Sequence, residues 1–172
     1  MSSHDLKKVT IGTNVKHIDP GAFLDCINLE TLNISNGLID IGDASFASTA
    51  LQEIIIPKSV TSIGLAPFAD CSKLVSISVD PSNSVFDSRE DCNAIITTSI
   101  NTLHTGCNST IIPNSVIAIA SNAFYSSIRV RFSRAFASVI SSAYSRSPPI
   151  GRPLAMRLTI TGYGRSSCAR YA

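Results

Sequence analysis

Residues 51–68 read LQEIIIPKSVTSIGLAPF. One set of six apolar side chains in this stretch falls at offsets 0, 3, 5, 9, 12 and 17 from Leu51. The same six offsets hold apolar residues when they are counted from Leu6 and from Leu29. Such self-similarity at a fixed spacing is the sequence signature of a repeat protein.

The repeating units begin at residues 6, 29, 51, 74 and 107, so successive steps are 23, 22, 23 and 33 residues. The last step equals one period plus ten inserted residues. A unit of this length cannot fold alone, because one fully buried apolar side chain contributes about 1.5 to 3 kcal/mol whereas ordering one residue costs about 1 to 2 kcal/mol. Stacked units share one core. The sequence therefore predicts a β-rich repeat solenoid of four to five coils over residues 6–127, with an irregular insertion at about 80–106.

Each unit is predicted to contain two short extended pieces followed by a tight helical turn. Residues 51–56 are expected to form a strand that ends at Pro57, which cannot donate to a ladder. Residues 60–63 form the second extended piece, and residues 64–71 form the turn. This turn carries its phenylalanine inward, so the rings at this position are expected to line up along one axis. They belong to Phe23, Phe46, Phe68 and Phe124.

The first extended piece of each unit also predicts an exposed face. Successive side chains of a strand point to opposite faces, so offsets 2 and 4 point outward if the apolar offsets 3 and 5 point inward. The candidate binding residues on this face are Lys8, Thr10, Thr31, Asn33, Glu53, Ile55, Ser76, Ser78, Ser109 and Ile111. Alternatively, Thr, Ser and Ile occupy these positions only because they suit a strand.

Two phrases resemble a known family. Residues 51–64 with Phe68 and Cys71, and residues 111–116 with Phe124, resemble the BspA-type leucine-rich repeats of microbial surface proteins. The resemblance covers about residues 6–127. It implies a right-handed leucine-rich-repeat coil with a parallel sheet on the concave face and short or helical turns on the convex face. It also implies a role in adhesion or protein binding and no catalytic activity. The polar exposed face suits contact with a protein or a glycan, and an intracellular interaction scaffold is the alternative function.

The residue types that carry chemistry are sparse. None of the three histidines stands at metal-ligand spacing from a second histidine or a cysteine pair. Cys92 or Cys107 with His104, oriented by Asp91, is the arrangement nearest to a nucleophile and its base. Its short spacing is explained as well by coincidence on a hairpin. We therefore expect no catalytic residue, no metal site and no cofactor.

The chain has no run of 18 apolar residues and begins without the apolar core of a secretory signal. These features predict no membrane span and a cytoplasmic location for the sequence as written. The family resemblance instead implies a cell-surface or secreted location if the sequence is a fragment of a longer protein.

The last 45 residues differ sharply in charge from the rest. Six basic and twelve acidic residues give residues 1–127 a net charge of −6, whereas residues 128–172 carry eight Arg and no acidic residue. One interpretation is an amphipathic helix at 130–145 that caps the solenoid, followed by disorder. A second is contact with nucleic acid or an anionic membrane, which makes nucleic-acid binding an alternative function. A third is a segment not selected together with the repeats, such as translation in a shifted reading frame.

Overall fold

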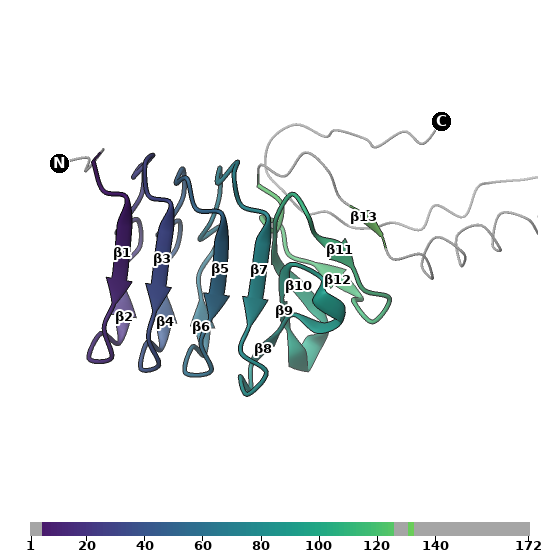
Figure 1. Ribbon diagram of the computed structural model, residues 1–172. Helices are drawn as coiled ribbons and strands as arrows, with labels where there is room; N and C mark the ends of the chain where they lie inside the picture. The colour runs from purple at the N-terminus through teal and green to yellow at the C-terminus, as the bar shows by residue number, and fades with distance from the viewer. Residues whose placement is uncertain (1–4, 126–130, 133–172) are drawn as a thin grey trace, which may run out of the picture.

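The computed structural model describes residues 5–125 and the backbone of Arg131 and Phe132. Each regular coil contains a four-residue strand and a two-residue strand, and the coils stack side by side along the molecule (Figure 1). The strands of this part are β1 (Lys8–Ile11), β2 (His17–Ile18), β3 (Thr31–Ile34), β4 (Asp40–Ile41), β5 (Glu53–Ile56), β6 (Ser62–Ile63) and β7 (Ser76–Val79). The predicted β-rich solenoid is confirmed.

The strands of neighbouring coils pair in parallel, and each residue lies opposite the residue at the same offset in the next coil. The four-residue strands β1, β3, β5 and β7 are called the front strands. Strand β1 pairs with β3, with Lys8 opposite Thr31, and β5 pairs with β7, with Glu53 opposite Ser76. No ladder joins β3 to β5 in the described structure, although the two strands are neighbours. The two-residue strands form an unbroken back sheet in the order β2, β4, β6. A repeat that stacks on its own copies requires this matching of offsets.

The apolar offsets of the second and third coils form the core. The side chains without exposed surface include Leu29, Leu38, Ile41, Phe46, Leu51, Ile56 and Val60. In the first coil, which contacts one neighbouring coil in the described structure, the equivalent Leu6, Val9 and Phe23 are partly exposed. Ile11 and Ile18 of the first coil are nevertheless buried, and Leu32 and Ile34 of the second coil are only partly buried, so a second neighbouring coil raises burial at some offsets and not at all of them.

The segment that carries each phenylalanine is a turn and not a helix. Offsets 15 and 19 of the regular coils are left-handed, with φ between 49° and 65°, at Gly21, Ala44, Ala66, Asp25, Ser48 and Asp70. The turns donate to the next coil: Phe23 N donates to Ser45 O at 2.7 Å and Phe46 N donates to Pro67 O at 2.9 Å. This third row of hydrogen bonds holds the rings in register. Phe46 stacks on Phe23 and Phe68 at centroid distances of 5.1 and 5.8 Å.

The backbones of neighbouring coils approach each other closely at Gly42. A Cβ atom there would lie 2.5 Å from Pro20 N and 2.7 Å from Ile18 O, in the preceding coil. Gly42→Ala is expected to lower the free energy of unfolding by about 2 kcal/mol, because two backbones must separate. Urea unfolding measures the loss. Gly12→Ala is the matched control, since a Cβ at Gly12 meets nothing within 4 Å; equal effects of the two substitutions would contradict the close approach.

The fourth coil contains an antiparallel hairpin where the sequence indicated only an irregular insertion. The remaining elements are β8 (Phe86–Asp87), η1 (Arg89–Asp91), β9 (Ala94–Thr97), η2 (Thr98–Ile100), β10 (Thr102–Gly106), β11 (Ile111–Ile112), β12 (Ala118–Ile119) and β13 (Arg131–Phe132). Strands β9 and β10 form the hairpin, and the sheet order is β12, β10, β9, β8. The inserted residues thus lie between the fourth and fifth units (Figure 1).

Strand β9 divides the core in two. Ile95 packs with the cluster of the first four coils, whereas Ala94 and Ile96 pack with a second cluster at the insertion. Because side chains alternate along a strand, β9 gives one face to each cluster. Phe124 packs against the second cluster, beside Gly106. The stacked column of the described structure thus comprises Phe23, Phe46 and Phe68, whose alignment is confirmed, while the alignment of Phe124 with them stays a prediction.

The predicted tail elements are described only at their start. Arg131 and Phe132 form β13, which pairs in parallel with Ile111 and Ile112 of β11. At these two positions a strand stands where the sequence analysis expects the start of a helix. The rest of the predicted helix, residues 130 and 133–145, and most of the basic tail considered for nucleic-acid contact lie outside the described residues.

Candidate binding surface

The outward side chains of the front strands form two rows across four coils. Lys8, Thr10, Thr31, Asn33, Glu53 and Ile55 are exposed, and Ser76 and Ser78 are half-buried. The register aligns them, since Thr10 lies opposite Asn33 and Ile55 opposite Ser78. Inward neighbours such as Ile54 and Ile77 are buried. These eight residues lie where the alternation along a strand places them; their role in binding stays a prediction.

The other two candidate residues lie beyond the insertion. Ile111 belongs to β11, which pairs with β13 and not with β7, and its N–H donates to Cys92 O at 3.0 Å. The chain of the insertion thus runs beside the fifth unit, and β9 is a neighbour of β7. Ser109 is half-buried in the segment just before β11. The rows of the front strands are therefore interrupted before Ser109 and Ile111.

An open hollow of about 410 Å³ lies on the front strands. Its lining residues are Glu30, Thr31, Leu32, Gln52, Glu53, Val75 and Ser76. Glu30 also approaches Lys73, at 3.8 Å between Oε1 and Nζ, with both side chains at least half exposed. An exposed pair at this distance is weak. The sequence analysis named Thr31, Glu53 and Ser76 but missed the hollow.

The residues considered for catalysis do not form a dyad in the described structure. Cys107 Sγ donates to Asn93 O at 3.4 Å, whereas His104 Nδ1 lies 2.8 Å from Thr105 Oγ1. Burial raises the pKa of the Cys107 thiol and lowers the pKa of His104. Burial also raises the pKa of Cys92, to about 11. These shifts favour a neutral thiol and a neutral imidazole, whereas an activated cysteine needs the thiolate.

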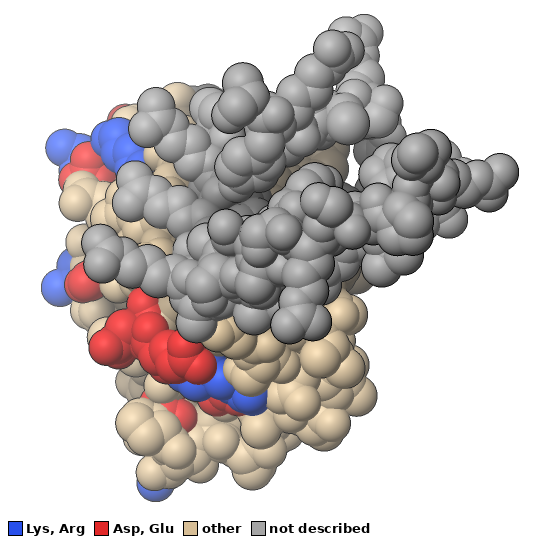
Figure 2. All heavy atoms as spheres, turned by 90° about the vertical axis from the view of Figure 1, so that its right-hand side faces the viewer, with Lys and Arg blue, Asp and Glu red and all other residues tan. Residues whose placement is uncertain are grey.

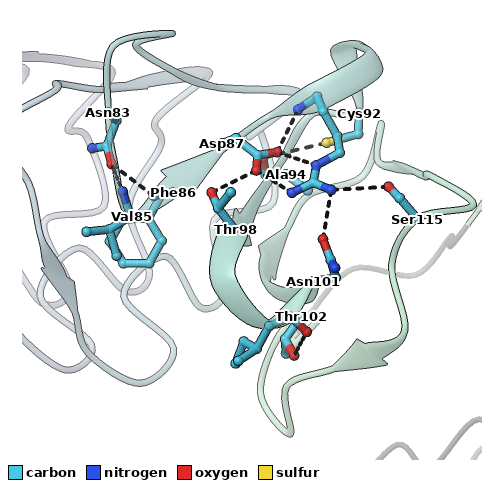
Figure 3. Close-up of polar contacts among 12 residues, drawn as sticks. Asn83, Val85, Phe86, Asp87, Cys92, Ala94, Thr98, Asn101, Thr102 and Ser115 are labelled. Atoms are coloured by element: carbon cyan, nitrogen blue, oxygen red, sulfur yellow. Dashed lines mark hydrogen bonds and ion pairs between the residues drawn. The ribbon is translucent and has the colours of Figure 1, made fainter.

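A polar network unforeseen from the sequence braces the insertion (Figure 3). Arg89 Nε donates to Asp87 Oδ1 at 2.7 Å, and Arg89 Nη1 donates to Asn101 Oδ1 at 2.8 Å and to Ser115 Oγ at 3.4 Å. Burial alone would raise the pKa of Asp87, but hydrogen bonds from Arg89 and Thr98 outweigh it and lower this pKa. The network links the insertion to the fifth unit. At this end of the molecule, Figure 2 shows acidic side chains gathered beside basic ones.

Two further features concern only the residues that the structure describes. No group of three or more His, Cys, Asp or Glu side chains there is arranged to hold a metal ion. No helix in the described ranges has the length and apolar character needed to cross a bilayer.

Solved structures with a similar fold include a bacterial cell surface protein and a bacterial vaccine antigen. A leucine-rich cell surface protein from Faecalibacterium prausnitzii is 28% identical with a TM-score of 0.63, over 74% of this chain and 35% of that one. The pneumococcal vaccine antigen PcpA is 21% identical with a TM-score of 0.65, over 74% and 34%. A leucine-rich repeat protein from Eubacterium ventriosum is 15% identical with a TM-score of 0.52, over 75% and 48%. The chain thus spans about a third to a half of these proteins' lengths.

A search of curated proteins finds no match to this chain. Among protein families, the BspA-type leucine-rich repeat region matches residues 1–127 in six copies. The match covers the stacked coils, the insertion and the fifth unit described above. The chain belongs to the BspA-type leucine-rich repeat family.

Proposed function

We propose that this chain is a non-enzymatic interaction module that binds a protein partner through the front strands. The observation that carries the proposal is the pair of aligned outward rows, whose side chains are held by a buried core and offered to solvent. Repeats of this family generally serve protein interactions. A stack of short parallel strands gives such a surface a fixed shape before the partner arrives, which lowers the entropy lost on binding.

The outward residues favour a protein over a glycan. Ile55 is 61% exposed in a field of hydroxyl, amide and charged side chains, which suits the mixed chemistry of a protein interface. The eight outward residues include no aromatic ring. The fold neighbour from Faecalibacterium prausnitzii is a cell surface protein, which supports a location at the cell surface for this chain. Adhesion is the role that we propose there.

The test compares front and back variants of the whole chain. Asn33→Arg combined with Ile55→Arg places two large cations on the front rows, while His17→Arg combined with Thr61→Arg places two on exposed back positions. The wild-type chain is first screened against a panel of purified surface and matrix proteins to obtain a partner. We expect the front variant to weaken that partner's affinity about tenfold or more and the back variant to leave it unchanged. Binding lost only in the back variant would contradict the assignment.

A further inference from the structure

Part of the hollow lies where β3 and β5 fail to pair, and the rest lies over the starts of β5 and β7, which do pair. The sequence explains the failure between β3 and β5. Four residues separate Phe46 from Leu51, whereas five separate Phe68 from Leu74. The turn that leads into β5 is therefore one residue shorter than the turn that leads into β7. At the regular junction, the N–H groups of Val75 and Ser76 both donate to Gln52 O. The described structure has no equivalent pair of bonds to Glu30 O.

The ladders on either side show which backbone groups face the gap between β3 and β5. In a parallel ladder, alternate residues turn their N–H and C=O groups to opposite neighbours. The backbone N–H groups of Thr31 and Ser35 donate to the first coil, on the side of β1. Leu32 is at an alternate position of the strand, so its backbone N–H and C=O groups point toward β5. The N–H group of Ser76 donates to Gln52 O, so the C=O group of Gln52 points toward β7. The backbone groups of Glu53 and Ile55, at the alternate positions, therefore point toward β3. The floor of the hollow thus includes two facing strand edges that no ladder joins.

The lining adds negative charge and aliphatic surface to these edges. Glu30 and Glu53 supply carboxylates, and Leu32 and Val75 supply apolar carbon, with Val75 51% exposed. The pair between Glu30 and Lys73 is exposed and spans 3.8 Å, so a better donor can replace Lys73. The hollow is therefore rich in acceptors, and its aliphatic residues can pack against an alkyl stem.

The width and the lining restrict what can enter the hollow. An inserted strand would hold its two neighbours about 10 Å apart, whereas β3 and β5 approach within 8 Å between Cα atoms. A sugar would find no aromatic ring among the lining residues. A guanidinium group fits better, because it only donates, its planar fork matches a carboxylate, and its stem is apolar.

We propose that the hollow over the starts of β3, β5 and β7 receives an arginine side chain from a basic segment of the protein partner, with Glu30 and Glu53 as its acceptors. This assignment rests on the proposed function and names the partner's chemistry. Leu32 and Val75 contact the stem of the side chain, and the carbonyl groups of the two strand edges accept further N–H groups. Charge complementarity selects the partner, since residues 1–127 carry a net charge of −6.

The probe is an acetylated, amidated tetra-arginine peptide titrated into the full chain and followed by backbone amide NMR. We expect the largest shift changes at Leu32, Glu53 and Ile55. Glu53→Gln is expected to weaken binding about fivefold, since one exposed carboxylate is lost. Glu90→Gln, an exposed acidic residue of the insertion, is the matched control and should leave the affinity unchanged. A tetra-lysine peptide should bind less tightly, because an ammonium group lacks the fork.

Equal weakening by the two substitutions, or shifts confined to other surfaces, would overturn the assignment. The chain's own arginine-rich segment, residues 133–172, is a competing occupant. Changes in its arginine Nε–H signals caused by Glu53→Gln without peptide would identify that segment and overturn the partner assignment. Failure of the peptide at the hollow, together with partner binding that Asn33→Arg and Ile55→Arg abolish, would reject this inference while leaving the proposed function intact.

Discussion

Phe46→Ala is expected to lower the free energy of unfolding by about 4 kcal/mol, since it removes a large side chain from a core that cannot fully collapse. Phe46 has no exposed surface and stacks on a ring in each neighbouring coil, at 5.1 and 5.8 Å. The substitution therefore opens a void between coils and removes two aromatic contacts at once. Urea unfolding followed by circular dichroism measures the loss.

Phe23→Ala is the matched control for this prediction. Phe23 occupies the same offset in the first coil, but it is half-buried and stacks on Phe46 only, as far as the described residues show. Its loss should be clearly smaller, about 1 to 2 kcal/mol. If Phe23→Ala destabilises as much as Phe46→Ala, the ring column does not derive its stability from stacking between coils.

Asn83→Leu is expected to lower the free energy of unfolding by about 3 kcal/mol, because it leaves hydrogen-bonding groups unpaired in a partly buried site. Asn83 Nδ2 donates to Pro57 O and to Val60 O, each at 2.9 Å. Its Oδ1 accepts from Val85 N and Phe86 N, each also at 2.9 Å. This one side chain thus fixes the start of the insertion against the preceding coil.

The repeat pattern alone leads to the opposite expectation. Offset 9 holds Val15, Leu38 and Val60 in the regular coils, so a leucine at residue 83 restores the consensus, which commonly stabilises a protein. Asn83→Asp is the informative second variant, since it keeps both accepted bonds and loses both donated ones. Denaturant unfolding should give the wild-type protein a higher free energy of unfolding than either Asn83→Asp or Asn83→Leu. A gain in stability for Asn83→Leu would show that the four bonds contribute little.

The regular coils could be predicted because equal offsets in neighbouring units contact each other, so a local pattern reports a long-range contact. The insertion could not be predicted in this way. Its strand β9 contains Ala94, Ile95 and Ile96, an unbroken apolar run whose periodicity does not distinguish a strand from a helix. In the structure all three residues are buried, as in a strand covered on both faces. The antiparallel pairing with β8 and β10 depends on contacts that no repeat encodes.

The candidate site shows the same division. Alternation along the strand placed Thr10, Asn33 and Ile55 on the surface, because the opposite face is buried. The interruption before Ile111 depends on where the inserted chain runs, which its length of ten residues does not reveal. One feature of the sequence did point to the hollow: the second and third repeats start 22 residues apart, whereas the neighbouring repeats start 23 residues apart. Its structural effect could not be calculated from that step, because a shorter turn can be absorbed by the turn itself or by the strand that follows.

Strand β9 also has a consequence for how the molecule loses structure. Strand β9 lies between the two hydrophobic clusters and contacts both, so each cluster can unfold as its own cooperative unit. Fluctuations that expose the residues around Leu103 need not disturb the rings near Phe46. We therefore expect the amide hydrogens of β9 to exchange only after both neighbours have opened, and more slowly than those of the described repeats.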